Sequence, residues 1–199
     1  MNLEAKKIIH KLQMTSSLIN DKINHFSCEY KGHFITLSVM KKINKIEQIG
    51  YIPSCICTTE IIKTIQPDLI LNLGTAGGIK KKGVELKDLV LADYFSYHDH
   101  FMPNYFKEYS IGKRKCSLIP NLKNTKIGTV SSSYSTEISA NSWERLNNSN
   151  ILAVDMEANA IAEICEFYNI KFSSLKVITD LLDESNNKND LVNEFITNF

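Results

Sequence analysis

The chain has 199 residues, 43% of them hydrophobic, and a formal net charge of +1 at pH 7. This length suffices for a sizeable core, and we expect residues 1–199 to form a single domain. The balanced charge argues against nucleic acid or an anionic membrane as partner, because both recruit proteins through an excess of basic residues.

The hydrophobic pattern predicts helices that alternate with short apolar strands. In chain order we expect a helix over 3–13, a strand over 34–39, a helix over 54–65, strands over 69–73, 89–92 and 126–130, an alanine-rich helix over 155–168 and a strand over 172–178. Pro67 ends the second helix, since proline lacks the backbone N–H that a helix interior needs. The alternation predicts an α/β domain with a mixed or mostly parallel central sheet.

The five cysteines show no metal-ligand spacing beyond a lone Cys-x-Cys at 55–57. An odd number of cysteines without a signal-peptide pattern is typical of reduced thiols in the cytoplasm. No apolar run approaches the roughly 20 residues that a membrane-spanning helix needs. We therefore expect a soluble, cytoplasmic protein without a metal site.

The strand over 69–73 runs directly into Gly74, Gly77 and Gly78, which we interpret as a glycine-rich turn. Such glycines allow positive φ and close approach of the backbone to a ligand, whose hydroxyls or anionic groups the N–H groups can bind. Asp180 follows another strand, and ligands of open α/β sheets bind beyond the carboxyl ends of strands. Both segments are therefore expected at one pocket, with a tight turn that binds nothing as the alternative.

Glu157 is expected on the apolar face of the helix over 155–168, together with Ile161 and Ile164. A carboxylate on an apolar face needs a partner, and a pair of sugar hydroxyls would supply one, with Met156 in apolar contact. The alternative is a first-turn glutamate that the helix dipole favours.

Asp180 also has two interpretations. If it faces the pocket, it could protonate a purine nitrogen and help the base to leave, which requires a pKa raised by partial burial. General acid catalysis of this kind is typically worth about 10²–10⁴-fold in rate. Otherwise Asp180 is the N-cap of a helix, a role that Asp183 could fill as well.

Five segments, in this order, resemble the signature of the nucleoside phosphorylase and nucleosidase family: Gly74–Gly78, Asp88–Asp93, Tyr97–Asp99, Asp155–Ala158 and Val177–Asp180. The likeness covers nearly the whole chain. Gly-Thr-x-Gly-Gly, together with Lys176 before Val-x-Thr-Asp, is most similar to the plant-type nucleosidases that cleave 5′-methylthioadenosine and S-adenosylhomocysteine. The resemblance implies a three-layer α/β fold with a mixed central sheet flanked by helices, a nucleoside substrate, a homodimer, and no metal or organic cofactor.

The resemblance also implies roles for individual residues. Asp180 would be the acid that acts on N7 of adenine. Met1–Ala5 is similar to the family's first βα turn, so Glu4 would activate the attacking water, and Thr75 would help to orient that water.

The remaining implied residues bind the substrate. Glu157 would hold the ribose 2′ and 3′ hydroxyls, and Met156 would pack against the sugar. Gly77 belongs to the glycine-rich segment of the same pocket, and Thr136 or the neighbouring Ser135 would contact adenine.

The chain departs from the family pattern in three places. Ser133 and Tyr134 stand where the family usually has Gly-Asp, which restricts φ and adds bulk. Only three residues precede Glu4, and the chain ends soon after Glu194-Phe195. We therefore expect this fold to lack the family's first strand and last helix.

Phosphorolysis needs cations to hold phosphate, and arginine is the favoured residue for it. The two arginines, Arg114 and Arg145, lie outside the motifs, which favours water as the nucleophile and an N-glycosyl hydrolase, although lysine could substitute for arginine. The alternatives are a phosphate-dependent purine nucleoside phosphorylase and a catalytically decayed, non-enzymatic family member. His98 and Trp143 are expected to serve hydrogen bonding and packing.

Overall fold

The computed structural model describes residues 2–17, 21–117 and 122–184, without the side chains of residues 2–4. The chain divides after Gln66 into two compact units, here called unit 1 (up to Gln66) and unit 2 (from Pro67). The described elements of unit 1 are α1 (Asn2–Lys11), β1 (Thr15–Ser17), β2 (Ile23–Tyr30), β3 (His33–Met40) and α2 (Tyr51–Ile65).

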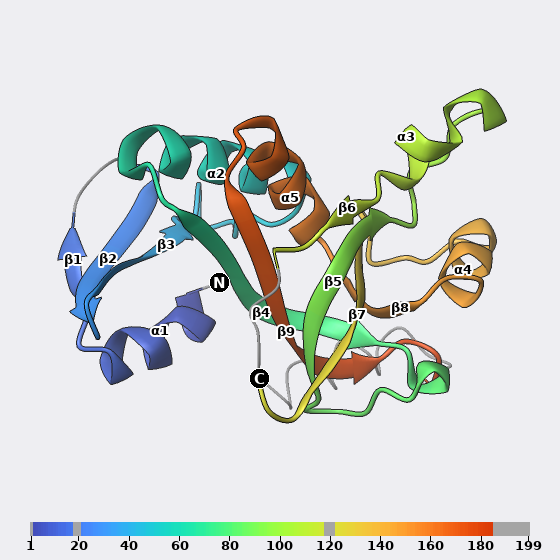
Figure 1. Ribbon diagram of the computed structural model, residues 1–199, viewed down its shortest axis with the longest axis horizontal. Coiled ribbons are helices and arrows are strands. Elements are labelled where there is room, and N and C mark those ends of the chain that lie inside the picture. The colour runs from blue at the N-terminus through green and yellow to red at the C-terminus, as the bar shows by residue number, and fades with distance from the viewer. Residues whose placement is uncertain (1, 18–20, 118–121, 185–199) are drawn as a thin grey trace. The chain divides into compact units, whose positions relative to one another are not determined.

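Unit 1 contains an antiparallel sheet in the order β1-β2-β3 (Figure 1). Lys31 and Gly32 connect β2 to β3 and both have positive φ, as a two-residue hairpin turn requires. The predicted strand and both predicted helices of this unit are confirmed within a few residues. α2 ends at Ile65, followed by Gln66 in the left-handed conformation and then by Pro67.

The elements of unit 2 are β4 (Leu69–Gly78), η1 (Lys80–Lys82), β5 (Leu89–Tyr97), η2 (Asn104–Phe106), α3 (Lys107–Ile111), β6 (Arg114–Lys115), β7 (Thr125–Ser132), α4 (Ala140–Asn147), β8 (Ile151–Asp155), α5 (Ala158–Phe167) and β9 (Lys171–Leu181). Every strand predicted in this region is present, although β4, β5 and β9 run further than expected. β6, α4 and β8 were not predicted.

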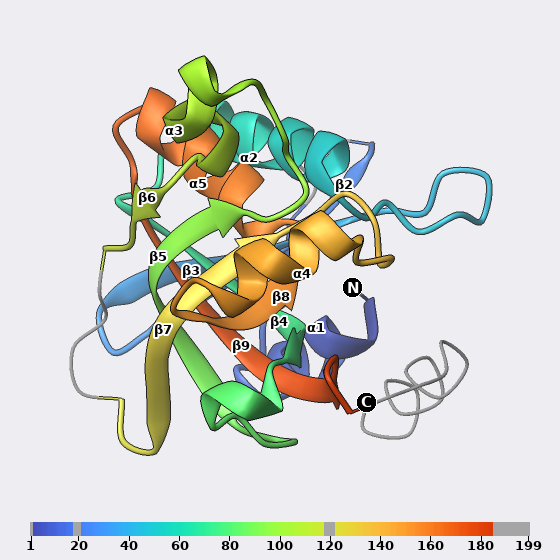
Figure 2. The same cartoon turned by 90° about the vertical axis from the view of Figure 1, so that its right-hand side faces the viewer.

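The strands of unit 2 form one mixed sheet in the order β6-β5-β7-β8-β4-β9. β5–β7, β7–β8 and β4–β9 are parallel pairs, whereas β4–β8 and β5–β6 are antiparallel. β9 also pairs with β5, so the sheet closes on itself instead of remaining open (Figure 2). α5 contacts β5, β7 and β9, and the apolar side chains between them form the core, among them Val90, Phe95, Val130, Ala162 and Phe172.

The glycine-rich segment is strand, not the predicted turn. Gly77 and Gly78 pair with β8 on one side and with β9 on the other, and neither these glycines nor Gly74 has a positive φ. A Cβ at Gly78 would lie 2.7 Å from Ile178 Cγ2 and 2.9 Å from Val84 Cγ1. Glycine is therefore needed at position 78 for close packing between strands rather than for an unusual backbone conformation.

The predicted helix over 155–168 is also corrected. β8 continues to Asp155, and α5 begins only at Ala158 because the Asp155 carboxylate accepts hydrogen bonds from the first backbone N–H groups. Glu157 is the N-cap residue of α5, with φ −136° and ψ −38°, and does not lie on the helix face. Asp180 lies within β9, which contradicts its interpretation as a helix N-cap.

Candidate active site

Asp180 and Gly77 are direct neighbours on paired strands. Gly77 of β4 is the register partner of Asp180 of β9, and a Cβ at Gly77 would lie 3.0 Å from Asp180 Oδ2. Thr179 Oγ1 donates a hydrogen bond to Asp180 Oδ1 at 3.0 Å. The absence of a side chain at position 77 thus leaves room for the Leu182 side chain, 2.8 Å from a Cβ there, and for the half-buried Asp180 carboxylate.

Met156 and Glu157 follow the strand on the other side of β4. Gly77 pairs with Val154 of β8, and the antiparallel direction carries the chain beyond Val154 towards the Thr75 end of β4. Met156, Glu157 and Thr75 are all half-buried. The neighbouring strands β8, β4 and β9 therefore bring five of the predicted site residues into one region.

A buried ion pair underlies this region. Lys176 Nζ of β9 lies 2.8 Å from Asp155 Oδ2 at the end of β8, and the two side chains are only 2% and 1% exposed. Ser132 Oγ of β7 donates a hydrogen bond of 2.6 Å to Asp155 Oδ1. We predicted no role for Asp155 and used Lys176 only as a family marker. The available signal was a lysine between the apolar residues Leu175 and Val177 of a predicted strand.

The loop between β7 and α4 carries the departure from the family pattern. Ser133 does not have a positive φ, so serine causes no backbone strain there. Tyr134 is 61% exposed, which gives its ring room, and its N–H donates to Asp99 Oδ2 at 2.6 Å. Thr136 lies in the same loop and is exposed. Neither backbone strain at Ser133 nor steric crowding of the Tyr134 ring is therefore seen in this loop.

Glu4 lies in α1 of unit 1, in a helix rather than in a strand-to-helix turn. Its side chain is outside the described residues, as are Glu194 and Phe195.

Residues 4–199 match the model of the phosphorylase superfamily. The chain belongs to this superfamily. Among its relatives, a 5′-methylthioadenosine/S-adenosylhomocysteine nucleosidase of Arabidopsis thaliana is 32% identical over 142 residues, which cover 69% of this chain and 56% of the relative. A 5′-methylthioadenosine nucleosidase of the same plant is 33% identical, over 69% of this chain and 53% of the relative. The chain thus spans about half the length of these curated relatives.

Two solved structures show the same fold over the full length of this chain. The Arabidopsis thaliana 5′-methylthioadenosine nucleosidase in apo form superposes with a TM-score of 0.92 at 26% identity, covering 100% of this chain and 84% of that one. An MTA/SAH nucleosidase gives the same TM-score and coverage at 28% identity. These structures confirm the predicted nucleoside phosphorylase-like α/β fold.

Whether a member of the phosphorylase superfamily can use phosphate as its nucleophile depends on cationic side chains that are available to hold phosphate. The guanidinium of Arg145 donates hydrogen bonds to groups of the protein itself. Its Nη1 donates to backbone carbonyls 2.9–3.4 Å away, and its Nη2 donates to Ser110 Oγ at 3.2 Å. The carbonyls belong to Tyr97, His100 and Ser110. Arg145 also lies over the ring of Phe101, 4.4 Å from its centroid.

Arg114 is engaged in the same way. It pairs with Glu163 at 3.3 Å and with Glu166 at 3.0 Å on α5, and Nη1 donates to the carbonyl of Gly112 at 2.8 Å. Both arginines of this chain are therefore occupied by the protein itself.

His98 directly follows β5 and is buried, and its Nδ1 lies 3.1 Å from Ser131 Oγ. Burial lowers the pKa of His98 from 6.5 to about 4, although Asp99 and Asp155 raise it, and Arg145 lowers it further. The imidazole is thus neutral at pH 7 and serves as a hydrogen-bonding group, as the sequence predicted.

The low pKa of His98 makes folding pH-dependent. Between pH 6.5 and about pH 4, His98 is protonated in the unfolded chain but neutral in the folded chain. The contribution to stability is therefore complete above pH 6.5 and falls as the pH drops to about 4, by up to about 3 kcal/mol. Urea unfolding at pH 7 and pH 4.5 measures it, and His98→Asn should lower the pH dependence by this amount. An identical pH dependence in the variant would contradict the assignment.

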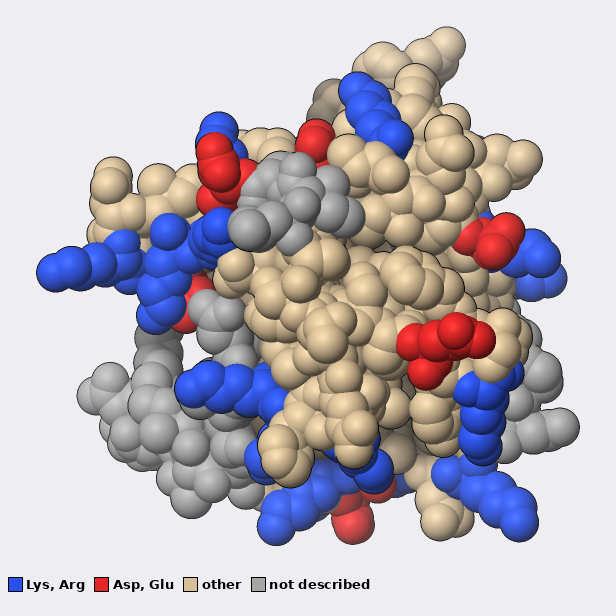
Figure 3. All heavy atoms as spheres, turned by 90° about the vertical axis from the view of Figure 1, so that its left-hand side faces the viewer, with Lys and Arg blue, Asp and Glu red and all other residues tan. Residues whose placement is uncertain are grey.

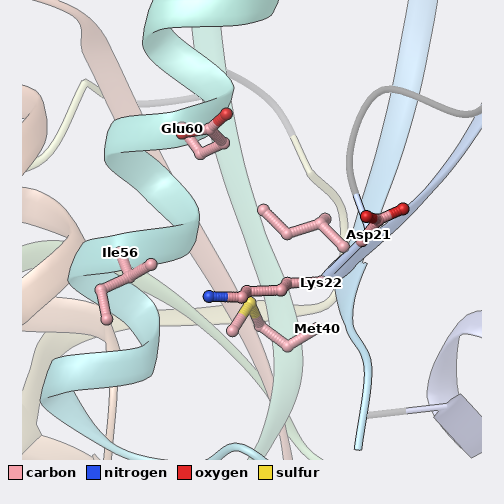
Figure 4. A pocket seen from close by; sticks show the side chains of 6 residues that line it. Asp21, Lys22, Met40, Ile56 and Glu60 are labelled. Carbon is pink, nitrogen blue, oxygen red and sulfur yellow. The ribbon is translucent and has the colours of Figure 1, made fainter.

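Unit 1 contains a cavity of about 320 Å³ lined by Asp21, Lys22, Ile23, Met40, Ile56 and Glu60 (Figure 4). None of these residues is a predicted site residue, and the carboxylates, the lysine and the apolar side chains indicate no single ligand class.

No group of three or more His, Cys, Asp or Glu side chains in the described residues could hold a metal ion. On the face drawn in Figure 3, lysine and arginine side chains project at several separate places around the edge. Across the described helices, none is long and apolar enough to cross a membrane.

Proposed function

We propose that this protein hydrolyses the N-glycosidic bond of 5′-methylthioadenosine, and also that of S-adenosylhomocysteine, with release of adenine and the thioribose. The observation that carries the proposal is the position of Asp180 on β9: its register partner is Gly77 of β4, and β4 also pairs with β8, which leads into Met156 and Glu157. The names of the relatives support the same substrates.

The proposed reaction breaks the bond between C1′ of the sugar and N9 of adenine. Asp180 donates a proton to N7, so that adenine leaves as a neutral base while positive charge develops on the sugar. Water then bonds to C1′ and gives up its proton, with Thr75 orienting the water; the family resemblance implies Glu4 as the base. Loss of the base through an oxocarbenium-like sugar, between an acid and a base, follows the logic of glycoside hydrolysis.

The substrate is held by the remaining residues of the site. Glu157 accepts hydrogen bonds from the ribose 2′ and 3′ hydroxyls, and Met156 packs against the sugar. Gly77 allows close approach of the substrate to β4, and Thr136 contacts adenine. No metal or organic cofactor takes part.

A purine nucleoside phosphorylase is the second candidate, since phosphate would replace water in the same site. The occupation of Arg114 and Arg145 by carboxylates and carbonyls favours water. A non-enzymatic family member is the third, and the presence of Glu4, Glu157 and Asp180 argues against it.

Adenine release from 5′-methylthioadenosine, followed with and without inorganic phosphate, tests the proposal. We expect the same rate in both, with free methylthioribose as the sugar product. Release only with phosphate, and methylthioribose 1-phosphate as product, would establish a phosphorylase. No release under either condition would support the non-enzymatic alternative.

We further propose that the protein is a cytoplasmic homodimer and that residues 1–199 belong to one domain, in keeping with the family match over residues 4–199. All five cysteines are free thiols, as in a reducing compartment. The segment between β5 and β6 exposes large apolar side chains, whose contact with water is unfavourable. These are Phe101, Met102, Tyr105, Phe106 and Tyr109.

These exposed side chains are the proposed dimer contact. We expect the wild-type protein to sediment as a dimer, and Tyr105→Ser combined with Phe106→Ser to shift it to the monomer. The matched control is Phe167→Ser, since Phe167 is 80% exposed at the end of α5. A dimer that survives the double substitution would place the interface elsewhere.

A further inference from the structure

We infer that the buried pair of Asp155 and Lys176 positions Glu157, so that Asp155 acts on the ribose hydroxyls of the substrate without touching them. The inference rests on the proposed function, because it extends the role of Glu157 in substrate binding.

The Asp155 carboxylate is held by donors from three parts of unit 2. Lys176 Nζ of β9 lies 2.8 Å from Oδ2, and Ser132 Oγ of β7 lies 2.6 Å from Oδ1. The backbone N–H groups of Glu157 and Ala158 donate to the same carboxylate, at 3.4 Å and at 3.0–3.3 Å. One carboxylate therefore ties β7 and β9, two strands that do not pair with each other, to the turn that carries Glu157.

The turn is fixed on both sides of Glu157. Its N–H donates to Asp155 Oδ1, and its carbonyl accepts the first hydrogen bond of α5 from the N–H of Ile161 at 3.1 Å. With both peptide groups bonded, the backbone at Glu157 is held at φ −136° and ψ −38°, which sets the direction in which its side chain leaves the chain. Ser132 reinforces the arrangement, because its Oγ also accepts from the N–H of Asn159 at 2.9 Å.

The arrangement depends on the opposite charges of Asp155 and Lys176. A buried carboxylate without a counter-charge is unfavourable, and Lys176 supplies that counter-charge to an acceptor that binds several donors at once. Neutralising the pair would let the turn relax. A displacement of about 1 Å in a group that positions a substrate costs about 10²-fold in rate.

A merely structural ion pair would lower stability but would not distinguish between substrates. Positioning of Glu157 predicts that distinction, because only the contact with the ribose hydroxyls depends on the turn. The discriminating probe is therefore 5′-methylthioadenosine compared with its 2′,3′-dideoxy analogue, which offers Glu157 nothing to bind.

The experiment uses Asp155→Asn combined with Lys176→Met, which removes both charges while asparagine keeps an acceptor oxygen. We expect kcat/KM for 5′-methylthioadenosine to fall by about 10²-fold, and kcat/KM for the dideoxy analogue to stay nearly unchanged. Adding Glu157→Gln to this variant should cost little more than Glu157→Gln alone, since both act on one contact. Lys176→Arg, which keeps the charge, should recover most of the activity that Lys176→Met loses.

Equal losses on both substrates, or losses that add fully with Glu157→Gln, would overturn the inference. Amide hydrogen exchange supplies a measurement that needs no turnover: the N–H groups of Glu157 and Ala158 should exchange faster in the charge-free variant, relative to the amides of the core strands. Unchanged exchange would overturn the positioning role. An inactive wild-type protein with faster exchange in the variant would instead contradict the proposed function and leave the positioning of the turn supported.

Discussion

Asp180→Asn should nearly abolish adenine release while the protein remains folded. Asparagine is almost isosteric with aspartate, so the space above Gly77 stays filled, but its amide cannot give a proton to N7 of the leaving base. Loss of a general acid typically lowers the rate by about 10²–10⁴-fold. The measurement is kcat for 5′-methylthioadenosine, together with the circular dichroism spectrum and the unfolding midpoint.

Asp183→Asn is the matched control, because it makes the same chemical change three residues further along the chain. The Asp183 carboxylate accepts hydrogen bonds from the N–H groups of Lys80 and Lys81 at 2.8 Å and 2.9 Å. We expect this substitution to affect η1 and to leave kcat within a few-fold of the wild type. Comparable rates for Asp180→Asn and the wild type would rule out Asp180 as the acid.

Much of the fold could be predicted because its elements obey local rules. The strand over 69–73 is a short, mostly apolar run that is followed by Gly74, and α2 is bounded by Gly50 and Pro67. The closure of the sheet could not be predicted, since the pairing of β5 with β9 joins residues far apart in the chain. β2 escaped prediction because its sequence, from Ile23 to Tyr30, shows no clean alternation of apolar and polar residues.

Five of the predicted site residues lie in one region, but the backbone there differs from the prediction. Gly77 and Gly78 were interpreted as a turn because glycine usually marks one, whereas here they allow side chains of β9 and its neighbours to pack closely against β4. Alanine-rich sequence after Asp155 suggested a continuous helix. The helix begins at Ala158 because Asp155 is itself a buried acceptor, and neither its burial nor its partner is visible in local sequence.

The partner of Asp155 is Lys176, and removing only one member of this pair should strongly destabilise unit 2. Lys176→Met removes the ammonium group and leaves the Asp155 carboxylate without a counter-charge at 1% exposure. Breaking a buried pair from one side typically costs about 3–5 kcal/mol. Combining Lys176→Met with Asp155→Asn should recover a large part of this loss, because no isolated charge then remains inside the protein.

Unfolding in urea, followed for the single and the double variant, measures these free energies. The control is Lys126→Met, which breaks the 2.7 Å pair of Lys126 with Asp88, where the side chains are 40% and 25% exposed. Water can replace the lost partner there, so the cost should stay below about 1 kcal/mol. If Lys176→Met costs no more than Lys126→Met, Asp155 does not need its counter-charge, and the acceptor that starts α5 is stabilised by Ser132 and the backbone N–H groups alone. If instead the single variant is strongly destabilised and the double variant is not, the cost comes from the unpaired charge, and Lys176 is what permits a charged acceptor at the end of β8.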